Sequence, residues 1–187
     1  QLYNEQNINF DNNNIQKELS EFINERFKYF MKEKGIRQDI IETSTYSYNI
    51  DNIIKIYNKA NVLNKIILKE VGKDIIFSYK RAFSILNSEL RDKELEIYGT
   101  PDLGLFKNNF ENNLYKKIHE IRKDFTNVAR EDDYESLLSS LASAKKEVSE
   151  FFDNVKVNDD EEILRKNRLE LLQMLCKTFD NYFNFSK

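Results

Sequence analysis

Apolar side chains recur every three to four residues along most of the chain, which is the spacing of amphipathic helices. The clearest stretch covers 15–34 and is followed by Gly35, a residue that often ends a helix. A shorter helix is predicted over 37–42. Two more are predicted over 51–67 and 71–90. The first half of the chain is therefore expected to be helical.

The single proline, Pro101, lies between Gly99 and Gly104. Proline fixes φ and glycine loosens the backbone, so this segment is predicted to be an irregular loop. Helical spacing of apolar residues resumes after the loop, over 110–125. The loop therefore separates two helical parts of the chain.

Two further helix starts are indicated by pairs of residues that form capping boxes. Asp132 with Glu135 predicts the start of a helix that runs to about 155. Asn158 with Glu161 repeats the signal and predicts a last helix that reaches the end of the chain. Together these segments predict an all-α fold, a multi-helix bundle of roughly six or seven helices.

Composition supports this prediction and narrows the class of protein. The chain has 187 residues, of which 40% are hydrophobic and 33% charged, with only 4 Gly and 1 Pro. These values are typical of a globular protein with long helices and short links. No apolar run is long enough to cross a bilayer and no signal-peptide pattern is present, so we expect a soluble, cytoplasmic protein without a membrane partner. The chain begins with Gln1, and we expect it to be a piece of a longer protein.

The sequence offers little for catalysis or metal binding. His119 is the only histidine and Cys176 the only cysteine, too few ligands for a zinc or di-iron site. His119 has no nucleophile motif around it and is interpreted as a half-exposed helix residue. Cys176 lies in an apolar stretch and is expected to be reduced and partly buried. The four glycines never form a nucleotide-binding loop. We therefore predict no catalytic residue, metal or cofactor in this chain.

Basic residues occur in local clusters although the net charge is −3. Such clusters are usually solvated helix faces, but each could also contact the phosphates of a nucleic acid. Any RNA contact must come from these clusters, because the whole chain has no basic excess. They are Lys80 with Arg81, Lys116 with Lys117, Arg122 with Lys123, Lys145 with Lys146, and Arg165 and Lys166 with Arg168.

Arg168 differs from the other cations because its helical position falls within the apolar stripe of the last helix. A buried guanidinium needs a partner, since an unpaired buried charge costs several kcal/mol. We expect Asp153, on the preceding helix, to form a bidentate ion pair with it. A direct contact between Arg168 and phosphate is the alternative.

The order of several short segments resembles one family. In the last third these are DYESLL (133–138), VSEFFDNVKV (148–157), LRKNRLELL (164–172) and FNFSK (183–187). FINER (22–26), DII (39–41), KRA (80–82) and DLGLF (102–106) precede them in matching order. This series resembles the end of the bacterial glycyl-tRNA synthetase beta subunit over nearly the whole chain.

The resemblance implies a helical body over 1–108 and, over 109–187, an anticodon-binding bundle similar to the DALR type. It implies glycine tRNA as a partner, and an alpha subunit in an alpha2beta2 assembly that uses ATP and Mg for charging the tRNA. This chain would be the non-catalytic, tRNA-binding part of that ligase. Lys and Arg would contact phosphates, and amide and aromatic side chains would contact unpaired bases. Candidate RNA contacts are Lys80, Arg81, Arg122, Arg165, Lys166 and Asn167.

A second hypothesis is structural. These helices would dock the alpha subunit or brace the rest of the beta subunit without touching RNA. The net negative charge favours this alternative.

Overall fold

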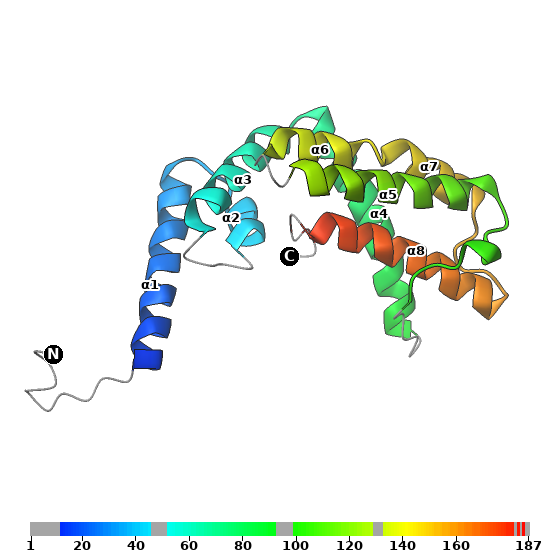
Figure 1. The fold of residues 1–187 in the computed structure, drawn as a ribbon, viewed down its shortest axis with the longest axis horizontal. Helices are drawn as coiled ribbons and strands as arrows, with labels where there is room; N and C mark the ends of the chain where they lie inside the picture. The colour runs from blue at the N-terminus through cyan, green and yellow to red at the C-terminus, as the bar shows by residue number, and fades with distance from the viewer. Residues whose placement is uncertain are drawn as a thin grey trace, which may run out of the picture. The chain divides into compact units, whose positions relative to one another are not determined.

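A computed structural model describes residues 12–45, 52–92, 99–128 and 133–181, together with Phe183 and Phe185. Within these ranges the chain forms eight α-helices and no strand, which confirms the predicted all-α fold (Figure 1). No helix in the described part is long and apolar enough to cross a membrane. The helices are α1 (Asn12–Glu33), α2 (Gln38–Thr45), α3 (Ile53–Ile66), α4 (Glu70–Asp92), α5 (Asn109–Val128), α6 (Tyr134–Ala142), α7 (Lys145–Asn154) and α8 (Glu162–Asp180).

Contacts within the chain define two compact units, residues 1–60 and 61–187. The boundary near 108 that the resemblance implies stays a prediction. In the contact units, α4 packs on α6, α7 and α8 and is therefore grouped with the helices that follow it. The Pro101 loop thus connects two parts of one unit.

The first unit contains α1, α2 and the start of α3. As predicted, α1 ends at Gly35, which has a φ of 78°. The Gly35 N–H donates to Lys32 O and the Ile36 N–H donates to Met31 O, which together form a Schellman motif. The accompanying apolar contact pairs Met31 with Ile36, both of which are buried.

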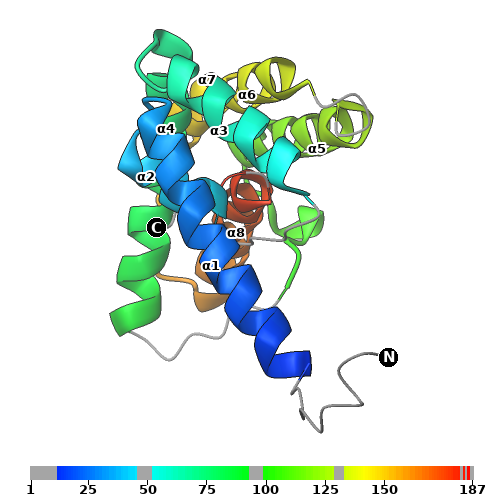
Figure 2. The same ribbon diagram turned by 90° about the vertical axis from the view of Figure 1, so that its left-hand side faces the viewer.

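The second unit is built around α8, which packs on both α4 and α5. Figure 2 shows α8 nearly end-on between these two helices. α6 and α7 pack on α4 and α5 as well, so every helix of this unit shares one core. Fully buried side chains from five helices contribute to it, among them Ile75, Leu114, Leu138, Phe151 and Phe179.

The single helix predicted over 132–155 is two helices, α6 and α7. The break falls at Ser143 and Ala144, where the Ala144 N–H donates to Leu141 O in a tighter turn. The Ser143 hydroxyl donates to Ser140 O. Serine side chains that bind nearby carbonyl oxygens compete with regular helix bonds. Apolar periodicity continued across the break and concealed it.

The two helix starts predicted from capping boxes lie one or a few residues away from the observed N-caps. Asp133 is the N-cap of α6, and its carboxylate accepts from the Ser136 N–H (3.1 Å) and the Ser136 hydroxyl (2.6 Å). Asp132 lies outside the described residues. α8 has Glu161 as N-cap without a side-chain bond, rather than Asn158. Asp159 instead accepts from the Glu161 N–H at 3.0 Å.

A capping box that the sequence analysis missed opens α5. Asn108 Oδ1 accepts from the N–H groups of Phe110 (3.0 Å) and Glu111 (3.2 Å). In return, Glu111 Oε2 accepts from the Asn108 N–H (3.1 Å) and also from the Lys107 N–H (2.7 Å). Glu111 is 1% exposed. Its carboxylate is therefore a buried charge, and its Oε2 atom accepts hydrogen bonds from the backbone.

The Oε1 atom of Glu111 binds Arg168, which corrects the predicted pairing of Arg168 with Asp153. Arg168 Nε donates to Glu111 Oε1 at 2.8 Å, and Nη1 donates to Asp159 Oδ2 at 2.6 Å and to Lys156 O at 2.9 Å. Arg168 is 5% exposed, so its expected burial is confirmed. Asp153 is not the partner because it lies in an ion pair with Arg81.

We expect Arg168→Ala to lower the free energy of unfolding by about 3 kcal/mol, because Glu111 would keep a buried charge without its cation. Chemical denaturation measures this change. Lys166→Ala is the control on the same helix, where loss of an exposed side chain should shift stability by about 0.5 kcal/mol or less. Equal midpoints for the wild type and Arg168→Ala would contradict the prediction.

Asp159 gives a prediction that depends on pH. A hydrogen bond from the Glu161 N–H, followed by that from Arg168, lowers the pKa of Asp159 below its ordinary value of 3.8. Its stabilisation is therefore fully present above that value and is lost as the pH falls through the folded-state pKa. The stability difference between the wild type and Asp159→Asn should be constant from neutral pH to about 4 and shrink below it. Denaturation at a series of pH values tests this, and a difference that grows in acid would contradict it.

Candidate nucleic-acid interface

The structure separates the members of four of the five basic clusters. In these four, one member contacts a carboxylate or a hydroxyl, while a neighbour in sequence is exposed and has no ion pair among the described residues. The engaged members are Arg81 with Asp153, Lys117 with Glu120, Arg122 with Thr178, and Arg168 with Glu111 and Asp159. The exposed ones are Lys80, Lys116, Lys123 and Lys166. In the fifth cluster both members have ion pairs, Lys145 with Asp74 and Lys146 with Glu150. Carboxylates of the fold thus neutralise part of the predicted basic surface.

Arg81 lies beside two aromatic rings. The Arg81 guanidinium carbon lies 4.6 Å from the centroid of the Phe152 ring and 5.8 Å from that of Phe77. Arg81 Nη2 is 3.3 Å from Asp153 Oδ1, and the two side chains are 35% and 65% exposed. Lys80, the residue before Arg81 on α4, is exposed. We call Phe77, Lys80, Arg81, Phe152 and Asp153 the α4–α7 patch.

Two ion pairs fix α7 along α4 beneath this patch. Lys145 Nζ lies 2.6 Å from Asp74 Oδ1 at the start of α7, and Arg81 meets Asp153 at its end. The pairs are seven residues apart on α4 and eight apart on α7, so they hold α7 against α4 at two points. Contacts between α4 and α7 agree with this arrangement. The aromatic and basic side chains of the patch are therefore presented by two regular helices rather than by loops.

Arg122 is engaged inside the bundle. Its Nε donates to Thr178 Oγ1 at 2.8 Å, joining α5 to α8. Thr178 is fully buried and its hydroxyl donates to Met174 O. This guanidinium therefore serves helix packing with at least one of its nitrogens, and its neighbour Lys123 is the more exposed cation.

The three candidates at the start of α8 have different environments. Asn167 is 3% exposed, and its side chain forms two hydrogen bonds with the backbone of Asp102, at 2.7 Å to the N–H and 3.0 Å to the carbonyl. Arg165 is half-buried and its Nη1 approaches Asp159 O at 3.4 Å. Lys166 is exposed. The Asn167 amide thus already holds the backbone of the Pro101 loop, and its predicted contact with RNA stays a prediction.

The remaining candidates do not form one site. Arg165 and Thr178 are separated by thirteen positions of α8, which corresponds to about 20 Å along the helix. Arg122 contacts Thr178, and Tyr79 of α4 donates to Asp180 Oδ2 at 3.1 Å, so both lie against the last turns of α8. Arg165 and Lys166 lie at the opposite end of the same helix. The pair Lys80 and Arg81 is therefore the one candidate cluster that the structure combines with exposed aromatic surface.

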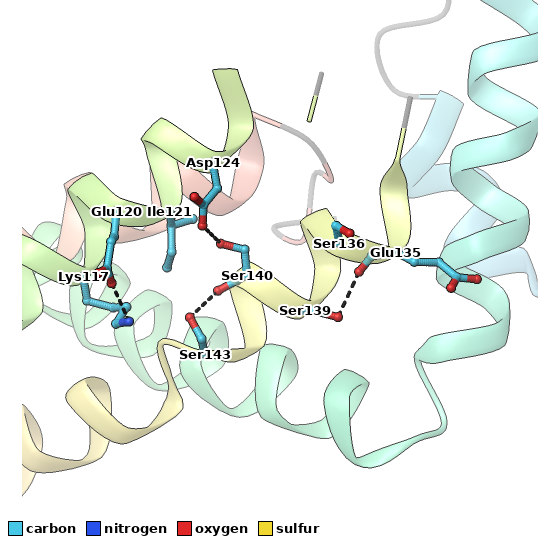
Figure 3. A pocket seen from close by; sticks show the side chains of 9 residues that line it. All are labelled: Lys117, Glu120, Ile121, Asp124, Glu135, Ser136, Ser139, Ser140 and Ser143. Carbon is cyan, nitrogen blue, oxygen red and sulfur yellow. Dashed lines mark hydrogen bonds and ion pairs between the residues drawn. The ribbon is translucent and has the colours of Figure 1, made fainter. Parts of the chain in front are cut away.

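A hollow of about 550 Å³ lies between α5 and α6 (Figure 3). Lys117 donates to Glu120 at 2.6 Å and the Ser140 hydroxyl donates to Asp124 at 2.7 Å. Glu135 adds a third carboxylate against the one ammonium group. The lining is net negative and rich in hydroxyls, so it does not suit a phosphate. The serines that line it are Ser136, Ser139, Ser140 and Ser143.

Neither His119 nor Cys176 forms a reactive centre. His119 is exposed on α5 and its ring lies 4.4 Å from that of Tyr115. Cys176 is a buried free thiol, and burial raises its pKa to about 12, with a smaller contribution from Asp180. The thiol is therefore protonated at neutral pH. No group of three or more His, Cys, Asp and Glu side chains that could hold a metal occurs among the described residues.

Sequence reasoning missed the aromatic half of the α4–α7 patch. Phe77 precedes Lys80 and Arg81 by three and four positions, and this spacing places all three on one helix face. That signal was present in the sequence. The approach of Phe152 and Asp153 was not, because it depends on how α7 packs against α4.

Comparison with known proteins identifies the class to which this fold belongs. Residues 75–185 match the DALR anticodon binding domain, and the chain belongs to this family. The matched region begins within α4 and extends past α8, so it contains the α4–α7 patch and the Arg168 cluster.

The curated relatives are glycine–tRNA ligase beta subunits. The chain is 30% identical to that of Rickettsia prowazekii over 166 residues, which covers 89% of this chain and 23% of the relative. It is 31% identical to that of Rickettsia typhi over 136 residues, or 73% of this chain and 20% of the relative. The chain thus spans less than a quarter of the length of these relatives.

We expect Asn167→Ala to lower the free energy of unfolding by about 2 kcal/mol, because it leaves the Asp102 N–H and carbonyl without their partner. Hydrogen exchange at Asp102 should accelerate in the same variant. Lys166→Ala again serves as the neighbouring control. If Asn167→Ala instead left stability unchanged and weakened RNA binding, the role assigned to this amide would be overturned.

Proposed function

We propose that this chain binds the anticodon arm of glycine tRNA as part of the beta subunit of a cytoplasmic glycine–tRNA ligase. The family match over 75–185 supports this, since it is the anticodon binding domain. The α4–α7 patch supplies the physical basis, because Arg81 lies over the exposed Phe77 ring and the partly buried Phe152 ring, and Lys80 is an exposed cation next to Arg81 on α4. This combination of cations and flat rings is what RNA loops require of a protein surface.

The chemistry of charging lies elsewhere in this proposal. Activation of glycine by ATP and Mg, and its transfer to tRNA, would take place on the alpha subunit of an alpha2beta2 enzyme. The role of this chain would be to fix the position of the tRNA. Phosphate contacts by Lys and Arg do this without reading sequence.

A structural role is the second candidate, and one observation favours it. The hollow between α5 and α6 has three carboxylates and one ammonium group, and it suits a basic segment of a partner protein better than RNA. The Arg165→Ala, Lys166→Ala double variant of the whole enzyme distinguishes RNA binding from a structural role at the start of α8. Lost aminoacylation with intact subunit assembly would support RNA contact there, whereas lost assembly would support the scaffold.

We expect the chain to bind the anticodon hairpin of glycine tRNA with an affinity that falls steeply with salt, because phosphate contacts release counterions. Lys80→Ala should weaken binding and reduce the slope of log affinity against log salt by about 1. Titration of a labelled hairpin at several salt concentrations measures both quantities.

Lys166→Ala is the matched control, since Lys166 is an equally exposed lysine of the same unit and lies on a different helix. It should leave the slope unchanged. A reduced slope for Lys166→Ala with none for Lys80→Ala would move the interface to the start of α8. No binding by the wild type at low salt would refute the proposed function.

A further inference from the structure

We propose that the α4–α7 patch is a stacking site for one unpaired RNA base. The base would lie on the Phe77 ring, Arg81 would hydrogen-bond its edge, and Lys80 would contact the adjoining phosphate. This inference rests on the proposed function and specifies which residues of the chain would hold the RNA loop. It assigns a role to Phe77 and Phe152, which nothing in the sequence analysis singled out.

Phe77 is exposed where a core residue would be buried. It is 39% exposed, whereas the residues two positions before and after it on α4, Ile75 and Tyr79, are 0% and 2% exposed. Lys80 follows three positions later and Arg81 four positions later on one helix face. An exposed ring flanked by cations suits a ligand that is both flat and anionic, which describes a nucleotide.

Arg81 is held in a shape that suits base contact. Its guanidinium carbon lies 4.6 Å from the Phe152 ring centroid, a distance typical of a cation–π contact. Asp153 holds one edge of the same group at 3.3 Å. The side chain is therefore fixed between two neighbours while remaining 35% exposed. A fixed planar donor loses little entropy when it binds the edge of a base.

The patch fits single-stranded RNA better than a duplex. In an A-form helix the bases stack on each other and the deep groove is closed to side chains. A ring on a convex helix surface can reach only a base that has left the stack. Asp153 adds selectivity of a general kind, because its 65% exposed carboxylate accepts from an amino group and repels a phosphate. The ligand class is therefore a loop nucleotide with a base amino group, flanked by a phosphate that reaches Lys80.

The test compares variants of the 187-residue chain for binding to the glycine tRNA anticodon hairpin. Phe77→Leu keeps apolar bulk and removes the ring, and it should weaken binding about tenfold without changing the salt slope. A fluorescent base analogue at successive loop positions should be quenched by the wild type at one position and by Phe77→Leu at none. Arg81→Lys keeps the charge but not the planar group, and it should also weaken binding.

Phe83→Leu is the matched control. Phe83 lies on the same helix, but its ring stacks on Tyr79 at 5.3 Å and is not part of the patch. It should leave affinity and quenching unchanged. Equal binding and equal quenching by the wild type and Phe77→Leu would overturn the stacking site while leaving the proposed function intact. Equal losses for Phe77→Leu and Phe83→Leu would also overturn it, since the effect would then come from the fold. Absence of hairpin binding by the wild type would refute the proposed function instead.

Discussion

The buried ion pair between Arg168 and Glu111 is the constraint on which the second unit depends. Both side chains are at most 6% exposed, and an unpaired charge at such a site costs several kcal/mol. Glu111 uses one oxygen for the N-terminus of α5 and the other for Arg168 of α8. Arg168 also binds Lys156 O and Asp159 in the α7–α8 connection. A shift of α5 along α8 would break the ion pair and leave the Glu111 carboxylate without its cation, so the packing register of these helices is specified by charge as well as by shape.

The first half of α8 makes further polar contacts that stabilise the fold. Asn167 holds the backbone of Asp102. Gly99 lies so close to the Glu170 carboxylate that a side chain there would clash with it. Asn167 and Arg168 therefore fasten Asp102 and Glu111, on the segment that leads into α5 and at its start. The polar surface of α8 that looked available for RNA in the sequence is therefore largely used within the protein, and this shifts the basis for an RNA interface to α4 and α7.

Helical spacing predicted most helices, and Pro101 with its flanking glycines predicted the loop, because both signals are local properties of the sequence. Helical spacing did not predict what covers each apolar face. Leu19 and Phe22 belong to the apolar stripe of α1, yet they are 54% and 58% exposed. Likewise, the position of Arg168 in an apolar stripe predicted burial and ion pairing but not the partner. Glu111 is 57 residues away, and only packing of α5 on α8 brings it there. Partners across helices are set by tertiary structure, which periodicity does not contain.

Overall charge is a poor guide to this protein's surface, and the separated basic clusters explain why. The chain carries −3, which argues against a generic nucleic-acid binder. Yet most acids that face the basic clusters neutralise one member and leave the other exposed, so local cations persist despite the acidic total. At the α4–α7 patch even the neutralised member stays accessible, because Arg81 is 35% exposed and an exposed ion pair is worth little. The Arg168 side chain, by contrast, is 6% exposed and paired with an almost fully buried Glu111. Burial, rather than charge, thus decides which arginine builds the fold and which one remains available to a ligand.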